Sequence, residues 1–231
     1  MLYWTISFPK HLADLNLIKL FSNTMLLVLL SSILLISLSF ISNYGNRVTR
    51  SKLLSVLTTF SVSGYAIPGI ILAVAFITFI SWLDNNVISF FGLQTIKSIF
   101  IGSILGLILV YFIRFYSLAS NGLKSGYLKI NYSIDESAYL LGYSKFKTFT
   151  NIHIPYLKNS MLLIGILITI EIIKELPITL IMRPFNFETF ATTAYIFASQ
   201  DLLEAAAAPS LFLIIIASFF ILITSRFILK D

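Results

Sequence analysis

Long apolar stretches separated by short polar segments dominate the pattern along the 231 residues. Five of these stretches are 18 to 22 residues long, which is the length that a helix needs to cross a bilayer. They cover residues 24–41, 66–83, 99–118, 159–176 and 206–227. The pattern therefore predicts an all-α, polytopic membrane bundle of about five transmembrane helices.

The second of these stretches has an unusual start. An apolar segment at 53–63 precedes it, and Gly64 to Gly69, with Pro68, then interrupts the helical pattern. Inside a membrane such a break is tolerated only where protein or a water-filled cavity meets the free backbone groups. Two interpretations stay open: a flexible gate element on a transport path, or a tight packing point between helices.

Three charged residues lie near the end of the fourth stretch: Glu171, Lys174 and Glu175. Lys174 follows Glu171 by three residues, so the two can pair on one helix face. Charged groups inside a span are costly and usually face a cavity or the bundle interior. These residues either line a hydrophilic translocation path together with Pro68, or only reach the interface.

Ser98, directly before the third stretch, is followed by Gly102 and Gly106 at four-residue spacing. Small residues at this spacing are typical of close helix contacts in membranes. We therefore expect a packing stripe there.

Composition agrees with a membrane protein, because 58% of the residues are hydrophobic and only 11% are charged, against about 25% in soluble proteins. The absence of cysteine excludes disulfides and thiolate metal sites. The net charge of +6 comes from scattered residues, so it does not indicate nucleic-acid binding. We expect no catalytic residue, metal site or cofactor.

The distribution of Lys and Arg predicts the orientation, since cytoplasmic loops carry the excess of positive charge. Eleven basic residues fall on one side: Arg47, Arg50, Lys52, Arg114, Lys124, Lys129, Lys145, Lys147, Lys158, Arg226 and Lys230. Five fall on or near the other: Lys10, Lys19, Lys97, Lys174 and Arg183. The loop between the third and fourth spans and the C-terminus are therefore expected in the cytoplasm.

That loop contains a polar segment at 133–155. Ser133 and Glu136 form a capping-box sequence that predicts the start of a short helix. Gly142 permits a sharp turn, and Ser144 can cap a second short helix over 145–152. Two short helices joined at a glycine make a compact projection, which suits docking better than catalysis.

The same segment carries a family resemblance. Five of its residues match the EAA loop of binding-protein-dependent ABC transporter permeases in type and spacing: Glu136, Ala138, Gly142, Ile152 and Pro155. The chain departs from the family pattern at Ser137, in place of a second small residue, and at Ile154, in place of leucine. The resemblance implies that Glu136, Ser137, Ala138, Gly142, Ile152 and Pro155 couple to an ATPase, within a coupling loop at about 119–158.

Residues 65–69, 174–177 and 180–192 are similar to ferric-iron permeases in particular, and the likeness extends over about 23–230. Ferric iron is a hard cation that prefers oxygen ligands, so Glu171 and Glu175 would suit it. Permeases for thiamine, polyamines, sulfate or phosphonates share the architecture and remain alternatives.

The resemblance implies a subunit of an ATP-driven importer in a bacterial inner membrane. Its partners would be membrane lipid, a cytoplasmic ABC ATPase dimer and a periplasmic substrate-binding protein. The chain itself has no G-x-x-x-x-G-K-[ST] sequence for binding nucleotide. With five spans, residues 1–231 resemble the C-terminal half of a fused permease without its first span. A second half, fused, separate or homodimeric, would complete the pore.

Other classes of function fit less of the sequence. A secondary transporter driven by an ion gradient could use Glu171, Lys174 and Glu175 as a relay, but it gives no reason for the spacing in 133–155. A membrane enzyme would need a Ser/His or paired-Asp arrangement that the spans lack. An assembly factor without transport activity would be distinguished by whether the chain co-purifies with an ATPase.

Overall fold

The computed structural model describes residues 1–8, 15–49, 51–92 and 98–228. Every regular element within these ranges is a helix, which confirms the all-α prediction. Four basic residues used to predict the orientation, Lys10, Arg50, Lys97 and Lys230, lie outside the described residues.

Five of the described helical segments are long and apolar enough to cross a membrane. They are α3 (Leu17–Thr49), α5 (Gly69–Phe90), α6 (Ile104–Leu128), the segment Lys145–Ile173 that ends in α9 (Ile154–Ile173), and α12 (Leu203–Ile228). Each corresponds to one of the five predicted spans, although the bounds differ.

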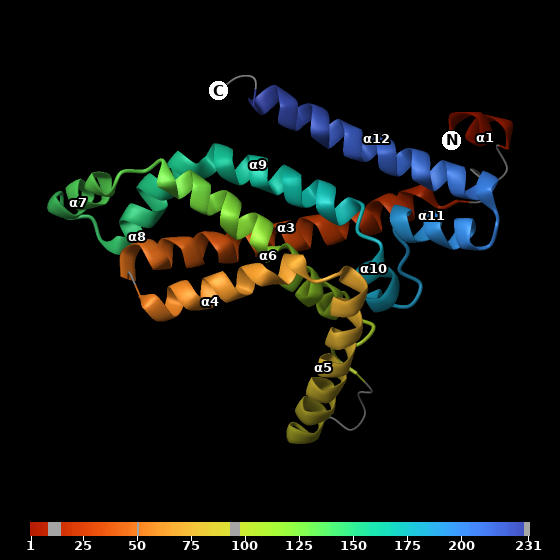
Figure 1. The fold of residues 1–231 in the computed structure, drawn as a ribbon, viewed down its shortest axis with the longest axis horizontal. Coiled ribbons are helices and arrows are strands. Elements are labelled where there is room, and N and C mark those ends of the chain that lie inside the picture. The colour runs from red at the N-terminus through yellow and green to blue at the C-terminus, as the bar shows by residue number, and fades with distance from the viewer. Residues whose placement is uncertain (9–14, 50, 93–97, 229–231) are drawn as a thin grey trace.

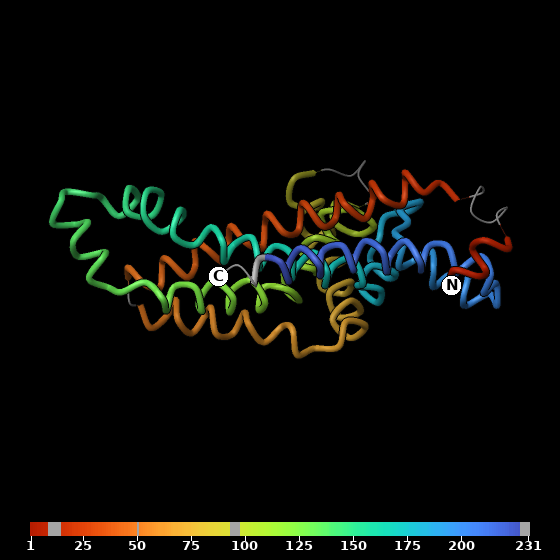
Figure 2. Tube along the Cα trace, turned by 90° about the horizontal axis from the view of Figure 1, so that it is seen from above, coloured from red at the N-terminus to blue at the C-terminus, as the bar shows by residue number. Residues whose placement is uncertain are grey.

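Helices α3, α6 and α9 pack against one another and form the centre of the bundle (Figures 1 and 2). Leu35, Leu107, Leu123 and Ile168 are fully buried among them. Helix α12 packs on α9 and carries the short α1 (Leu2–Ser7) and α11 (Phe190–Ser199) near one end. The core is thus a three-helix layer, with α12 laid over it.

Two elements depart from this layer. Helix α4 (Lys52–Val62) runs back along α6, and the short 3-10 helix η1 (Ser63–Ala66) joins it to α5. Helix α5 then projects away from the body, and its main helix contacts are with α10 (Pro177–Met182) and parts of α6 (Figure 1). The predicted break at Pro68 is therefore the point where the chain leaves the bundle.

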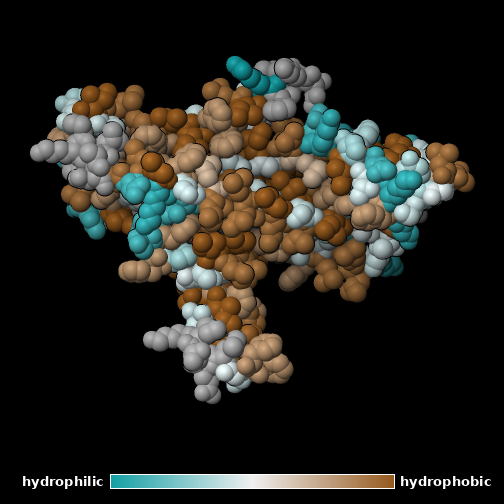
Figure 3. Space-filling model, turned by 180° about the vertical axis from the view of Figure 1, so that it is seen from behind, coloured by the Kyte–Doolittle hydropathy of each residue, from teal (hydrophilic) through white to brown (hydrophobic). Residues whose placement is uncertain are grey.

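The surface of the middle of the bundle is mostly hydrophobic, and hydrophilic residues gather towards its two ends (Figure 3). This distribution is the one expected of a protein whose sides face lipid.

Helix α3 is longer than the predicted 24–41 because the polar residues of its last turns find partners. Ser42 bonds to Tyr116, and Asn43 donates to the Ser120 carbonyl. Polar side chains that bond to neighbouring helices do not end a helix. The sequence pattern alone could not show those partners.

The predicted stripe of Ser98, Gly102 and Gly106 is wrong, because α6 begins only at Ile104. Residues 98–103 form turns, in which Gly102 has a positive φ of 66°. The buried Asp84 accepts the backbone N–H groups of residues 99–101 and fixes these turns. The glycine that allows α6 to approach α9 most closely is Gly122, where an added Cβ would lie 2.6 Å from Ile164.

Candidate functional site

A projection of the chain lies at one end of the bundle, between α6 and α9 (Figure 1). We call residues 131–153 the knob. Its elements are α7 (Tyr132–Leu140), the turn at Gly142, α8 (Lys145–Thr148) and the π-helical turn η2 (Phe149–His153). Single π-helical turns are rare and often mark functional positions.

The local chemistry of the knob matches the sequence in two of three respects. Gly142 has a positive φ of 80°, and the Ser144 hydroxyl caps α8 by accepting the Lys147 N–H at 3.2 Å. The predicted capping box at Ser133 is wrong, because α7 begins earlier. Asn131 is its N-cap, with Oδ1 accepting the Ser133 N–H at 3.2 Å.

Most of the residues that the resemblance assigns to ATPase coupling lie at the surface. Glu136, Ser137 and Pro155 are exposed, and Ile152 is half-buried. Ala138 is buried and packs inside the knob. Among the described residues the Glu136 carboxylate has no hydrogen bond or ion pair, so it is available to a partner.

The outer face of the knob is apolar. Leu140, Leu141 and Phe146 are 89%, 79% and 75% exposed, and Leu140 and Leu141 lie between two of the segments that are long enough to cross a membrane. An apolar patch outside the lipid region is typical of a protein–protein contact.

The base of the knob is fixed by a buried ion network that sequence analysis did not detect. Asp135 is 7% exposed and lies between Arg47 of α3 and His153 of η2. Arg47 Nε lies 2.6 Å from Oδ2, and His153 Nε2 lies 2.7 Å from Oδ1. The network therefore ties α7 to α3 and to the segment that continues into α9.

Arg47 also closes the turn that leads into the knob. Its two terminal nitrogens donate to the carbonyls of Tyr127, Ile130 and Asn131, at 2.9 to 3.3 Å. The planar guanidinium can bind several acceptors at once, which an ammonium on a lysine would not reproduce. Arg47 thus holds the end of α6 and the start of α7 in one geometry.

Aromatic contacts support the same joint. Tyr44 of α3 donates to the Lys145 carbonyl at 2.7 Å and packs against Phe149, with ring centroids 4.8 Å apart. Phe40 lies 4.8 Å from Phe149 and 5.8 Å from Tyr127. The knob is anchored to α3 by an ion network and by a hydrophobic cluster.

A second ion pair lies far from the knob, inside the bundle. Arg114 is in α6, eleven residues into the helix, and its Nε lies 3.4 Å from Glu175 Oε2. The orientation count placed Arg114 on the cytoplasmic side, whereas the structure places it inside the third span. A charge at this depth needs a partner, and Glu175, 8% exposed, supplies it.

The Arg114–Glu175 pair stabilises the break in the second span at Pro68. Arg114 Nη1 donates to the Ile67 carbonyl at 2.8 Å, directly before Pro68. Glu175 also accepts the Ile178 N–H at the start of α10. At Gly69 an added Cβ would lie 3.1 Å from Glu175 Oε1, so the backbone passes close to the ion pair.

The four residues predicted to line a translocation path thus lie in two separate places. Glu175 and Pro68 meet around Arg114, whereas Glu171 and Lys174 form a separate pair with Nζ 2.7 Å from Oε1. The predicted pairing of Glu171 with Lys174 is confirmed. Both side chains are partly exposed, at 25% and 54%, which fits a pair at the edge of the bundle.

Sequence reasoning missed Arg47, Asp135, His153 and the inward position of Arg114. Arg47 and Asp135 are 88 residues apart, so no local spacing connects them. Asp135 does carry a weak signal, because it follows the helix start, where an acidic residue is already explained by the helix dipole.

We predict that Asp135→Asn destabilises the protein by about 3–5 kcal/mol, because it leaves Arg47 buried without a counter-charge. Glu136→Gln, at the exposed neighbouring position, is the matched control and should change stability by less than about 0.5 kcal/mol. Unfolding of the purified chain in detergent, followed by circular dichroism, measures both. Equal effects would contradict the role of the network.

We predict a similar difference in stability loss when each of the two glutamates near the end of the fourth span is replaced by glutamine. Glu175→Gln removes the counter-charge of Arg114 and should cost about 3–5 kcal/mol. Glu171→Gln breaks a partly exposed pair and should cost about 0–1 kcal/mol. The same unfolding measurement separates them, and a larger effect at Glu171 would refute the assignment of Glu175 to the break.

The sequence matches no family model and no curated protein. Its fold resembles several solved structures, including the following two. One is the crystal structure of a bacterial ABC transporter involved in the import of the acidic polysaccharide alginate, with 17% identity over 98% of this chain and 87% of that chain, at a TM-score of 0.77. The other is the bacterial alginate ABC transporter in complex with an alginate pentasaccharide-bound periplasmic protein, with 17% identity, 95% and 80% coverage, and a TM-score of 0.75. At this identity the likeness shows the fold, and it extends over nearly the whole chain.

Proposed function

We propose that this chain is the membrane subunit of an ATP-driven ABC importer, in which the knob receives movement from a cytoplasmic ATPase dimer. The observation that carries the proposal is the construction of the knob. Its base is locked to α3 and α9 by Arg47, Asp135 and His153, while its tip exposes Leu140 and Leu141. A rigidly held projection with an apolar tip is suited to receive force from a partner.

Two further observations agree with the proposal. The EAA-like residues lie in the knob, and the fold resembles chains of ABC importers. The excess of Lys and Arg at the knob end favours a cytoplasmic location. These lines of support are independent, because charge asymmetry says nothing about motif spacing.

The remaining partners follow from the same proposal. A periplasmic binding protein would dock at the opposite end, near α10 and α11, where Arg183 pairs with Glu188. A second permease half would cover α5, whose outer face exposes Ile70, Val74 and Trp82 at 56% to 61%. Lipid would cover the rest of that face.

Ferric iron was the narrower substrate hypothesis, and the described residues give it little support. Glu171 faces Lys174 and Glu175 faces Arg114, so both carboxylates are already neutralised. The described residues contain no group of three His, Cys, Asp or Glu that could hold a metal ion. Ferric iron therefore rests on the sequence resemblance alone.

A secondary transporter remains the second class of function. Its relay would use Glu171, Lys174 and Glu175, but the structure pairs these residues in two separate ion pairs. It also leaves the exposed apolar tip of the knob without a purpose. The two classes differ in whether the knob contacts an ATPase.

We therefore predict that a photo-cross-linking amino acid at Leu141 captures an ATPase in bacterial membranes that contain the chain. The captured protein is identified by mass spectrometry through a G-x-x-x-x-G-K-[ST] peptide. The same amino acid at Leu53, an exposed leucine on α4, is the control and should capture none. Gly142→Asp should weaken the cross-link, because a side chain at a φ of 80° strains the turn by about 1–2 kcal/mol.

Membrane insertion of each variant, measured by its amount in the washed membrane fraction, should stay unchanged. Capture of an ATPase equally from Leu53, or from Leu141 in the Gly142→Asp variant, would count against docking at the knob. Failure of Leu141 to capture any ATPase would reject the proposal.

A further inference from the structure

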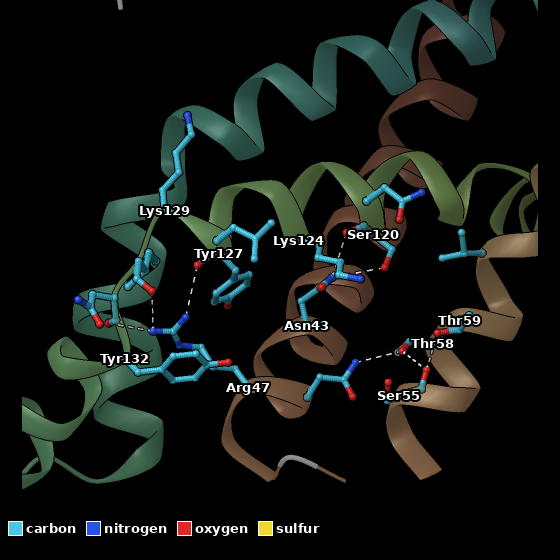
Figure 4. Close-up of a pocket in the computed structure, with 16 residues that line it drawn as sticks. Asn43, Arg47, Ser55, Thr58, Thr59, Ser120, Lys124, Tyr127, Lys129 and Tyr132 are labelled. Carbon is cyan, nitrogen blue, oxygen red and sulfur yellow. Dashed lines mark hydrogen bonds between the residues drawn. The ribbon is translucent and has the colours of Figure 1, made fainter. Parts of the chain in front are cut away.

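A polar cleft of about 640 Å³ lies beside the base of the knob (Figure 4). Its walls come from the last turns of α3, from α4, from the second half of α6 and from the turn that leads into α7. In Figure 4, Ser55, Thr58 and Thr59 of α4 lie on one side of the opening, and Arg47, Tyr127 and Tyr132 lie on the other. Neither the coupling role of the knob nor the ion pair at the break accounts for this cleft.

Helix α4 is amphipathic, but its apolar face points outward and its polar face points into the protein, which is the reverse of the arrangement in a soluble protein. Its large apolar residues recur at helical spacing on the outward face and are 54% to 78% exposed: Leu53, Val56, Leu57 and Phe60. The residues that line the cleft lie on the opposite face: Ser55, Thr58, Thr59 and Val62. A helix with its apolar face outward and its polar face inward separates a hydrophilic space from lipid or from an apolar partner.

The other two walls are polar as well. Helix α3 contributes Asn43 and Asn46, and α6 contributes Ser120 and Asn121. Asn46 Nδ2 donates to Thr58 Oγ1 across the cleft at 3.1 Å, which links α3 to α4. Three helices therefore direct hydrogen-bonding side chains to one space.

The charge of this space is positive. Lys124 and Lys129 line it, and neither ammonium has an acidic partner in the part of the chain that the structure describes. The third cation, Arg47, is compensated by Asp135. None of the sixteen residues that form the walls is acidic. In Figure 4 the Lys129 ammonium points away from the other lining residues, so the charge of the cleft comes mainly from Lys124. An uncompensated ammonium group beside hydroxyls and amides attracts anions and repels cations.

We propose that this cleft binds the negatively charged oxygens of a carboxylate- or phosphate-bearing ligand, with Lys124 as the main cation. The inference rests on the proposed function, because it makes the cleft a part of the transport path that selects anionic solutes over metal cations. The same chemistry is found in the headgroup of an anionic phospholipid, which basic clefts between membrane helices also bind. The experiment below separates the two sources.

Because the chain has no cysteine, single cysteines report on the cleft without background. Thr59→Cys places a thiol in the cleft, and Leu57→Cys places one on the outward face of the same helix. The full-length chain in phosphatidylcholine nanodiscs is labelled with two thiol-reactive thiosulfonate reagents. One carries a negatively charged sulfonate group, and the other carries a positively charged trimethylammonium group. The labelling rate with the anionic reagent is divided by the rate with the cationic reagent. This ratio, compared with the same ratio for free mercaptoethanol, reports the local charge.

Thr59→Cys should react with both reagents and favour the anionic one, whereas Leu57→Cys should react with neither. Adding Lys124→Gln should lower the rate ratio at Thr59→Cys by about fourfold, because it removes one nearby positive charge. Lys158→Gln, a lysine of α9 outside the cleft, is the matched control and should leave the ratio unchanged. The proposal would be overturned if Thr59→Cys did not react, or if Lys124→Gln left the ratio of labelling rates at Thr59→Cys unchanged.

The ligand is then tested by protection of Thr59→Cys from labelling. Slower labelling with galacturonate, but not with neutral galactose, supports a solute with carboxylates. Slower labelling only when the nanodisc contains phosphatidylglycerol supports a lipid headgroup. Equal protection by galactose, or no protection by either anion, would reject anion binding. No ATPase is needed, so failure here is distinguishable from failure of the knob to dock.

Discussion

The structure depends above all on one carboxylate, that of Asp135, which is removed from water and held between Arg47 and His153. A buried charge is tolerated only when it is paired and hydrogen-bonded, so these three residues must stay together. They come from α3, from α7 and from the π-helical turn before α9. One local electrostatic requirement therefore makes the knob and two membrane helices a single mechanical unit.

The break at Pro68 is held in a different way. Arg114 satisfies the Ile67 carbonyl and pairs with Glu175, but its Nε is 3.4 Å from the carboxylate and makes no hydrogen bond. This joint has fewer charge-assisted hydrogen bonds than the joint at the knob, so it is the weaker of the two. The cleft lined by α4 lies between them. If the knob moves, α3 and α9 would therefore move with it. The chain would bend at the junction between α4 and α5.

The sequence predicted what depends on local patterns and missed what depends on distant partners. Five spans, the turn at Gly142, the cap at Ser144 and the pairing of Glu171 with Lys174 all follow from spacing within a few residues, and the structure contains them. Arg114 was counted with the cytoplasmic side although it falls within the predicted third span, and only Glu175, 61 residues later, explains how its charge is held inside the bundle. The stripe at Ser98 failed because the buried Asp84 holds those residues in turns.

The central claim is that the knob and α3 move as one body while the chain bends at Pro68. It is tested most directly by distances between spin labels at pairs of introduced cysteines, measured by double electron–electron resonance in the chain assembled with the proposed ATPase. A label at Leu141 in the knob and one at Ile33 in α3 should keep the same separation with and without ATP. A label at Trp82 in α5 should change its distance to Ile33 on adding ATP. A shift between Leu141 and Ile33, with Trp82 unchanged, would contradict the account.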